Sequence, residues 1–224
     1  MSFYPELDNL SLKEVIDCFT ELPLDGPEYA AVYYQEVALL IAQQGTDGTA
    51  YLLGVLEDSN LDTDRLRSAL MALTQLQPEH SPRERQTLRQ LLSQYLYDQR
   101  PLIIAAAVDG LWRQNIKDAR DAVLRLQAHP SPYVRGSVLR YMSRLYPNEA
   151  VSLLVKALHD DDDIVRENAV DELDWLGARE ALDAIRPLAH DSNPAVRQAA
   201  ETAVANLSAM QEGANRVATS RPTI

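Results

Sequence analysis

A run of four aspartates, Asp160 to Asp163, is the first candidate for a chemical role, because closely spaced carboxylates can bind a cation. Calcium loops space their oxygen ligands and bend at a glycine, which this run does not contain. Carboxylates just before a helix also stabilise its N-terminus, because that end of a helix carries partial positive charge. No His-x-x-x-His pair that would indicate zinc is present. We therefore expect no metal site.

The single cysteine and the four histidines also favour structural roles. Cys18 has no histidine near it in the sequence, so a buried apolar role is more typical than a nucleophilic one. His129, His159 and His190 come where the second helix of a repeat is expected to end, where an imidazolium interacts well with the helix dipole. His80 is given a structural role as well. No Gly-x-Ser-x-Gly turn and no glycine-rich phosphate loop occurs. No catalytic residue and no cofactor is expected, and the enzyme question stays open.

Arginine and aspartate recur at a fixed spacing near the C-terminus. Arg135, Arg166 and Arg197 are 31 residues apart, as are Asp160 and Asp191. These arginines could form a strip that binds anions. Alternatively, each guanidinium could hold a carboxylate and loop carbonyls at a repeat junction, since it can donate to several acceptors at once. We favour the structural interpretation.

The same step organises the helices that must position these residues. A period of about 30 residues with apolar side chains at helical spacing is typical of an α-solenoid. Proline or aspartate opens the first helix of each pair, and a second helix follows. The expected pairs are 101–113 with 117–128, 132–145 with 149–158, and 163–176 with 179–189, followed by a last helix at 194–210.

The N-terminal half is less regular. Ser11-Leu12-Lys13-Glu14 and Ser81-Pro82-Arg83-Glu84 are capping boxes that predict helix starts. Between them, helices are expected from Gly26-Pro27 to Gln44, over 48–57, and from Asp62 or Thr63. The fold class is therefore all-α, a right-handed α-α superhelix of about twelve helices. Its expected parts are an N-terminal segment with one helix (1–26), the solenoid (27–210) and a disordered tail (211–224).

Two tryptophans and three tyrosines are the candidate partner-binding residues. In the 31-residue register, Trp112 and Trp175 replace residues that are mostly polar in the other repeats, which is typical of an interface anchor. Packing onto a neighbouring loop is the alternative. Tyr29 and Tyr33 are one helical turn apart, and Tyr34 is adjacent. These tyrosines could instead cover the helix at 11–22.

Charge restricts the class of partner. The 224 residues are 46% hydrophobic and carry a net charge of -12, a surface that phosphate backbones and anionic lipids repel. We expect no nucleic-acid or membrane partner. With one cysteine and no apolar segment typical of a signal or a span, a cytoplasmic location is expected. A basic row is nevertheless predicted on the second helices, which line the concave face in most arrays of this kind: Arg120, Arg125, Lys156, Arg179 and Arg186.

The repeated Asp, Val-Arg, Ala and Leu positions resemble the HEAT-like repeats of the bilin-lyase type. The residues that carry the resemblance lie in two stretches, Asp160 to Gly177 and Asp191 to Leu207, and the likeness covers about 98–210. It implies a helical solenoid. None of the histidines is followed by glutamate, so the His-Glu pairs of the di-iron HEAT-repeat hydroxylases are missing.

Three functions follow as hypotheses. The first is a non-catalytic scaffold or adaptor that binds another protein through the tryptophans and the basic row. The second, implied by the resemblance, is a phycobilin lyase subunit or a phycobilisome-associated chaperone or degradation factor. Such a protein would bind an open-chain tetrapyrrole (a bilin) or its carrier. The third is self-association through the C-terminal helix, whose Ala199, Ala200, Ala203 and Val204 precede no further helix.

Overall fold

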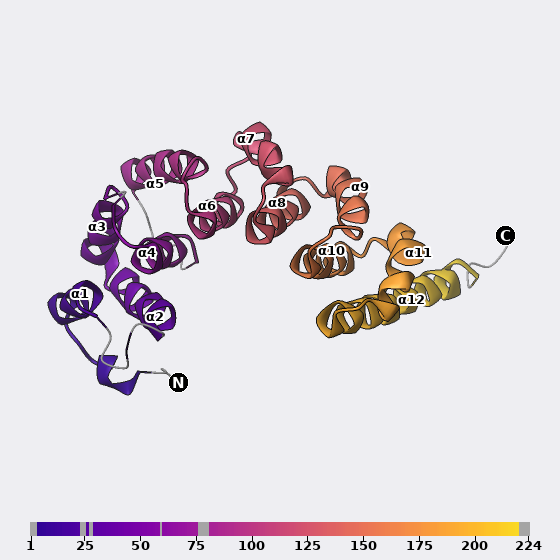
Figure 1. Cartoon of the computed structure of the whole chain (residues 1–224), viewed down its shortest axis with the longest axis horizontal. Coiled ribbons are helices and arrows are strands. Elements are labelled where there is room, and N and C mark those ends of the chain that lie inside the picture. The colour runs from indigo at the N-terminus through magenta and orange to yellow at the C-terminus, as the bar shows by residue number, and fades with distance from the viewer. Residues whose placement is uncertain (1–3, 23–25, 27–28, 59, 76–80, 220–224) are drawn as a thin grey trace. The chain divides into compact units, whose positions relative to one another are not determined.

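The computed structural model is built of α-helices (Figure 1). It describes residues 4–22, 26, 29–58, 60–75 and 81–219, with the backbone alone for 210–219. Twelve α-helices, several short 3-10 helices and no strand occur among these residues. This confirms the all-α class and the expected number of helices. Residue contacts divide the chain into two compact units, unit 1 (Met1–Ala122) and unit 2 (Val123–Ile224).

Unit 1 stacks its helices in two layers. In the first layer, α4 packs between α2 and α6, and in the second, α3 packs on α5. The α3 helix also packs on α2 and α4, and α5 packs on α6. A short 3-10 helix and α1, which packs on α2, precede the stack. The bounds are η1 Pro5–Leu7, α1 Leu12–Thr20, α2 Ala30–Gln43, α3 Gly45–Val55, α4 Thr63–Gln75, α5 Pro82–Tyr95 and α6 Pro101–Arg113.

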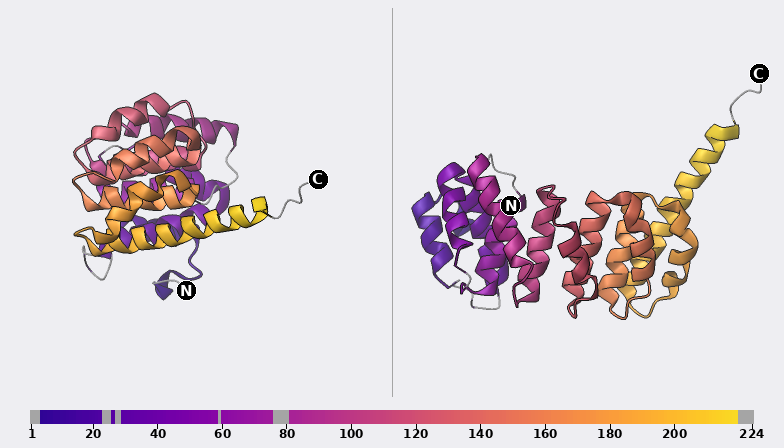
Figure 2. Two further views of the ribbon diagram at one scale, coloured as in Figure 1. Left: turned by 90° about the vertical axis from the view of Figure 1, so that its right-hand side faces the viewer. Right: turned by 90° about the horizontal axis from the view of Figure 1, so that it is seen from above.

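Unit 2 repeats the layered arrangement with greater regularity, and its helices lie side by side in Figure 2. In the first layer, α10 packs between α8 and α12. The second layer holds η3, α9 and the short helices η4, α11 and η5. The α7 helix (Arg120–Leu124) leads from unit 1 into unit 2. The bounds are η3 Arg125–Ala128, α8 Pro132–Leu145, α9 Pro147–Ala157, α10 Asp163–Leu176, η4 Arg179–Ala181, α11 Leu182–Ile185, η5 Arg186–His190 and α12 Pro194–Thr219.

Both predicted capping boxes are confirmed. The Ser11 backbone N–H donates to the Glu14 carboxylate at 2.8 Å, and the Glu14 N–H donates to the Ser11 hydroxyl. Ser81 and Glu84 repeat this exchange at the start of α5. Each box satisfies backbone donors that have no partner inside the helix, and this fixes the residue at which the helix begins.

The core of unit 2 is the pair of apolar stripes expected on its first helices. Neither helix of a pair can bury such a stripe alone, so neighbouring pairs must stack. The buried residues on α8 and α10 are Val134, Val138, Leu139, Met142, Val165, Ala169, Val170 and Leu173. On the second helices, Ala150, Leu154, Ala181, Ile185 and Leu188 are buried.

Two second helices are less continuous than the sequence predicts. In place of one helix over 117–128, α7 begins at Arg120 and passes into η3. In place of one helix over 179–189, the chain forms η4, α11 and η5. Pro187 lies within η5; it has no backbone N–H, and its ring clashes with the carbonyl four residues earlier. The α-helical pattern therefore cannot continue through it.

Two helix boundaries also differ from the expectation. Gly45, expected to close α2, is the first residue of α3; its φ of +76° gives the sharp junction that a side chain would strain. The α12 helix runs to Thr219, past the expected tail boundary at 211; no proline, which would interrupt a helix, occurs between Pro194 and Pro222. Pro23, Pro27, His80 and residues 220–224 lie outside the described part of the chain.

Candidate functional site

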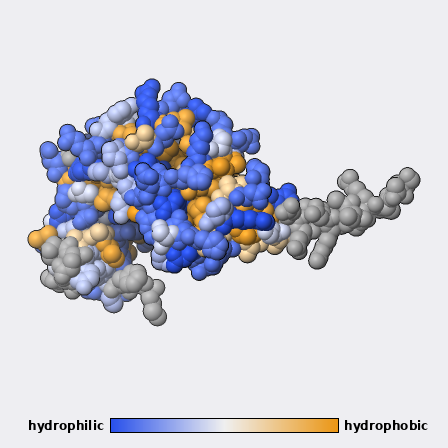
Figure 3. Space-filling model, turned by 45° about the vertical axis from the view of Figure 1, so that its right-hand side comes forward, coloured by the Kyte–Doolittle hydropathy of each residue, from blue (hydrophilic) through white to orange (hydrophobic). Residues whose placement is uncertain are grey.

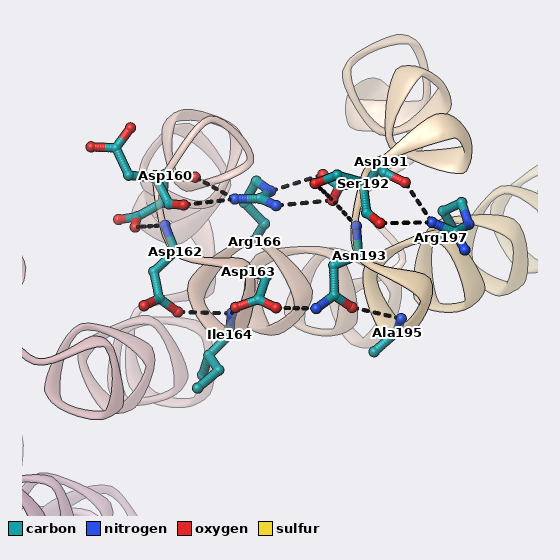
Figure 4. A network of polar contacts seen from close by, with 11 residues as sticks. Asp160, Asp162, Asp163, Ile164, Arg166, Asp191, Ser192, Asn193, Ala195 and Arg197 are labelled. Atoms are coloured by element: carbon teal, nitrogen blue, oxygen red, sulfur yellow. Dashed lines mark hydrogen bonds and ion pairs between the residues drawn. The ribbon is translucent and has the colours of Figure 1, made fainter.

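The three arginines with a 31-residue spacing, called the arginine ladder below, lie where the helix pairs of unit 2 meet. Arg166 at the start of α10 donates from Nε and Nη2 to both carboxylate oxygens of Asp191, at 2.8 and 2.9 Å (Figure 4). Its Nη1 donates to the carbonyls of Asp160 and Asp161 at 2.8 and 3.1 Å. One guanidinium thus holds the loop before its own helix and the loop before the next.

Arg135 makes the same contacts one repeat earlier. It donates to both carboxylate oxygens of Asp160 at 3.0 and 2.7 Å, and to the carbonyls of His129 and Pro130 at 2.9 and 3.0 Å. Arg197 donates to the two carbonyls of the preceding loop at 2.7 and 3.0 Å. Because loop carbonyls and carboxylates take up these donors, the ladder holds the repeats together and offers little to an external anion.

Electrostatics within the ladder favour the ionised carboxylates. Hydrogen bonds from Arg166 lower the pKa of the Asp191 carboxyl from 3.8 to about 2. Burial works against ionisation of Asp160, but its hydrogen bonds with Arg135 and with the Asp162 backbone N–H still lower its pKa. The ladder pairs are therefore charged at neutral pH.

The aspartate run serves the start of α10. Asp160 is engaged by Arg135, and Asp162 accepts from the Ile164 backbone N–H at 3.0 Å. Asp163 pairs with the Asn193 side chain in the next loop, as Figure 4 shows. No group of three or more potential metal ligands is found within the described residues. Capping and loop contacts thus account for three of the four carboxylates.

The histidine and cysteine side chains lie in local contacts. His129 accepts a hydrogen bond from the Ser131 backbone N–H through Nδ1 at 3.0 Å, just before α8. Cys18 is half-buried on α1 beside the Tyr33 hydroxyl. His159 and His190 are exposed at the ends of second helices.

The three candidate tyrosines, all in unit 1, differ in exposure. Tyr29 is 53% exposed, whereas Tyr34 is 2% exposed and donates from its hydroxyl to the Glu21 carbonyl at 2.7 Å. Half-buried Tyr33 lies edge-on to Tyr4, with ring centroids 5.1 Å apart. Tyr34 therefore packs α2 against the end of α1 and presents no surface to a partner.

Trp175 is the most exposed tryptophan and lies on the last turn of α10. The residue is 57% exposed, and the Arg144 guanidinium carbon of α8 lies 3.5 Å from the ring centroid. Such a cation over an indole face is attracted by the ring quadrupole. Gly177, in the left-handed conformation at φ +63°, ends α10 two residues later. The indole is thus supported on one face and accessible on the remainder.

A buried carboxylate fixes the arginine that supports Trp175. Arg144 Nη2 lies 3.2 Å from the Glu172 carboxylate, whose side chain is only 6% exposed. The Ser143 hydroxyl donates to the second oxygen of Glu172. Asn206 of α12 donates to Asp174 at 2.8 Å, which joins α12 to the same end of α10. These contacts order the surroundings of the indole before any partner binds.

Trp112 of unit 1 is in a different environment. It is half-buried on the last turn of α6, and the Arg113 guanidinium carbon lies 5.2 Å from its ring centroid. Of the two tryptophans that the register singled out, Trp175 therefore offers the larger accessible ring. Trp112 combines local packing with a smaller exposed part.

The predicted basic residues lie on the second-helix layer. Arg120 pairs with Asp121 at 3.2 Å. Beside Lys156, in unit 2, is a groove of about 420 Å³ whose apolar walls include Val138, Leu139 and Leu153. Four members of the row lie in unit 2 and are exposed: Arg125, Lys156, Arg179 and Arg186.

The C-terminal helix leaves less apolar surface than the sequence suggests. Ala200 and Ala203 are buried inside unit 2, and Ala199 and Val204 are half-buried. The α12 helix packs against α10, α11 and η5. Of these four residues, Ala199 and Val204 alone are partly accessible for self-association.

Sequence reasoning missed several exposed features. Hydrophilic residues cover most of the face in Figure 3, with hydrophobic residues in smaller groups. Tyr133 at the start of α8 is 52% exposed, and Leu22, Val32 and Tyr97 are also exposed. These residues occupy no unusual position in the 31-residue register, so that register could not single them out. It also gave no reason to connect Trp175 with the carboxylates that precede it on α10.

Those carboxylates form a row along α10. Glu167, Asp171 and Trp175 are four residues apart and therefore lie along one ridge of the helix, called the α10 row below. Partial desolvation of its carboxyl and repulsion from Glu167, Glu172 and Asp174 raise the pKa of Asp171 to about 6. Asp171 is exposed, so a partner could reach its carboxylate and would also meet the negative charges beside it.

Comparison with known proteins identifies the fold. A family model described as HEAT repeats matches residues 88–174 and 154–218. The Escherichia coli protein YibA is 14% identical, with 94% of this chain and 79% of that chain covered and a TM-score of 0.70. An engineered protein is 15% identical over 88% of this chain and 96% of its own, at a TM-score of 0.52.

A chain from the complex of CpcE and CpcF of phycocyanin lyase from Nostoc is 16% identical, with 92% of this chain and 99% of that chain covered. Its TM-score of 0.47 gives no support to a shared function. The search of curated protein sequences gave no match. No helix in the described part of the chain is long and apolar enough to span a membrane.

Proposed function

The chain belongs to the HEAT-repeat family, and we propose that it is a non-catalytic module that binds another protein through the surface around Trp175. The observation that carries this proposal is a tryptophan residue that is 57% exposed and whose indole is supported by Arg144 at 3.5 Å. Tryptophan, tyrosine and arginine are enriched at binding hot spots.

Preorganisation supports this assignment. Binding normally costs conformational entropy, because interface side chains must be fixed. Here Arg144 is already held by Glu172, and Glu172 is held by Ser143. A partner would therefore meet an aromatic side chain whose support is in place, and more of the contact energy would remain as affinity.

Further contacts to the partner are proposed on the second-helix layer and in unit 1. The groove beside Lys156 joins apolar walls to a cation, and Arg125, Arg179 and Arg186 are exposed on the same layer. In unit 1, Trp112, Tyr29 and Tyr33 keep partial exposure. We give these surfaces a secondary role, since none has an indole as accessible as that of Trp175.

Affinity capture from the native cell tests the proposal. Tagged wild-type protein and the Trp175→Ala variant are used as bait, with Tyr133→Ala as control, because Tyr133 is a similarly exposed aromatic residue of unit 2. We expect at least one protein to be retained by wild type and Tyr133→Ala and lost with Trp175→Ala, at unchanged melting temperature. Identical sets of proteins with all three baits would contradict the proposal.

The bilin-binding alternative rests on the sequence resemblance alone. Under it, the basic residues of the second-helix layer would bind the propionates of an open-chain tetrapyrrole, and an aromatic ring would stack on its pyrroles. The test is to titrate the protein with a bilin such as phycocyanobilin. A shift of the visible absorption band that is lost in Lys156→Ala would favour this alternative, and an unchanged spectrum would remove it.

A further inference from the structure

The α10 row carries negative charge that the protein does not neutralise. Glu167 and Asp171 have neither an ion pair nor a side-chain hydrogen bond within the described residues, whereas Glu172 is paired with Arg144 and Asp174 with Asn206. Asp171 is exposed, and Glu167 is half-exposed. The row thus presents two unpartnered carboxylates that lead to an exposed indole.

This charge pattern is unfavourable for α10 itself. Like charges four residues apart on a helix repel each other, as Glu167 and Asp171 must. Carboxylates near the C-terminal end also oppose the helix dipole, and α10 has no basic residue in its last turn. Desolvation of its carboxyl, together with the charges of Glu167, Glu172 and Asp174, also raises the pKa of Asp171. A cationic partner would relieve each of these repulsions.

The indole completes a site for a cation. One face of Trp175 carries Arg144, whose charge is offset by Glu172 at 3.2 Å. Because Arg144 covers one face of the ring and the residue is still 57% exposed, the other face is the side on which a further cation could stack. Tryptophan is the aromatic residue that binds a cation most strongly over its ring. Asp171 lies one helical turn before Trp175 on the same ridge of α10, within reach of the same cation or of a neighbouring one.

We propose that the α10 row binds a basic segment of the partner protein, with a lysine or arginine side chain over the free face of Trp175 and its neighbour paired with Asp171 and Glu167. This inference rests on the proposed protein-binding function and specifies the chemistry of the partner. The row runs along two turns of α10, so an extended segment with at least two cationic side chains fits it.

The first test uses fluorescein-labelled deca-arginine and decaglutamate, titrated into the full chain at 50 mM salt and followed by fluorescence anisotropy. We expect saturable binding of deca-arginine and none of decaglutamate. Trp175→Ala should weaken binding by about fivefold. Asp171→Asn should weaken it by about threefold, and about 0.5 M salt should remove most of this difference.

The matched controls separate a site from general attraction to an acidic protein. Asp183→Asn removes one exposed carboxylate from the second-helix layer of the same unit, and Tyr133→Ala removes an exposed aromatic ring. Neither should change the affinity for deca-arginine. Equal weakening by Asp183→Asn and Asp171→Asn would overturn the proposal, because binding would then follow net charge alone.

The two proposals fail in different ways. If deca-arginine does not bind while a captured protein still depends on Trp175, the basic-segment inference is wrong and the protein-binding function stands. If no captured protein depends on Trp175, the function itself fails. Asp171→Asn should not lower the melting temperature, because it removes repulsion, so its loss of binding cannot be attributed to unfolding.

Discussion

Arginine side chains hold the loops of both units, but they find their carboxylates in opposite directions along the chain. In unit 2, Arg166 reaches forward to Asp191, 25 residues later, so that each repeat is tied to the next. In unit 1, Arg100 pairs with Asp98, two residues before it, and donates to the Leu61 carbonyl at 2.7 Å. In unit 2 the tie between distant loops thus runs through a carboxylate, whereas in unit 1 the carboxylate is local and the distant contact is to a backbone carbonyl.

The sequence explains the difference. Thirty-one residues before Arg135, the position of the ladder arginine is occupied by Ile104, which is buried in α6 and has no group that could donate to a carboxylate. Thirty-one residues before Asp160, the position of the ladder aspartate is occupied by His129. Unit 1 instead places Arg65 beneath the end of α1, where it donates to three backbone carbonyls. Loss of the regular register therefore goes together with loops held by individual contacts.

The strongest test of this comparison removes a ladder arginine. Arg166→Ala leaves the Asp191 carboxylate, 11% exposed, without its guanidinium. Unpaired buried charge is costly, so the free energy of unfolding should fall by about 3 kcal/mol in a denaturant titration followed by circular dichroism. Arg166→Lys keeps the charge but not the bidentate contact, so its free energy of unfolding should lie between those of wild type and Arg166→Ala. A loss below about 0.5 kcal/mol, the size typical of ordinary surface substitutions, would contradict the role of the ladder.

The contacts of Arg65 in unit 1 should matter somewhat less. Arg65→Ala removes hydrogen bonds to carbonyls and the cation over the Tyr34 ring, 4.6 Å from its centroid, but leaves an aspartate that is 46% exposed. We expect a loss of about 2 kcal/mol in the same titration. Arg83→Ala, an exposed arginine at the start of α5, should change the free energy of unfolding by less than about 0.5 kcal/mol. Equal effects of the two variants would show that Arg65 adds nothing specific.

Acid should weaken unit 2 through its ladder. The pKa of Asp191 is about 2 in the folded protein against an ordinary value of 3.8, so the unfolded chain takes up the proton first. The stability that this carboxylate contributes is complete above about pH 4 and is lost as the pH falls toward 2. Melting curves of Asp191→Asn, less stable at pH 7, should show a smaller further loss over that range. If the melting temperatures of wild type and Asp191→Asn fell equally over this pH range, Asp191 would not be the source of the acid sensitivity.

The smallest expected effect concerns the α10 row. Asp171→Asn removes like-charge repulsion and should raise the free energy of unfolding by about 0.3 kcal/mol at pH 7, a small gain because solvent screens the charge of this exposed residue. Because the folded-state pKa of Asp171 is raised to about 6, its penalty appears as the pH rises from about 4 to 6. The gain should therefore vanish below about pH 4. A destabilised variant at pH 7 would mean that Asp171 has a partner that stabilises it.

The regular part of the fold could be predicted from the sequence because its signals are local. The bounds of α6, α8 and α10 agree with the expected 101–113, 132–145 and 163–176. Proline opens the first two of these helices and an aspartate opens the third, so a single residue fixes each start. The interruption at Pro187 was missed, because the apolar period continues through η5 although the α-helix does not.

The candidate site was predictable only in part. The register singled out Trp175 because its equivalents in other repeats are polar. The stacked Arg144 and the buried Glu172 depend on side chains meeting between α8 and α10, which a one-dimensional pattern does not specify. Tyr33 and Tyr34 are neighbours in sequence yet point about 100° apart on α2, and only the packing of α1 decided that Tyr34 is the buried one.

The central claim, that Trp175 anchors a protein partner, is tested most directly by calorimetric titration of the purified captured protein into three forms of the chain. Wild type and Tyr133→Ala should bind with equal affinity, and Trp175→Ala should lose about 2 kcal/mol, or roughly thirtyfold in Kd. All three should have the same melting temperature. Equal affinity of Trp175→Ala and wild type would contradict the account.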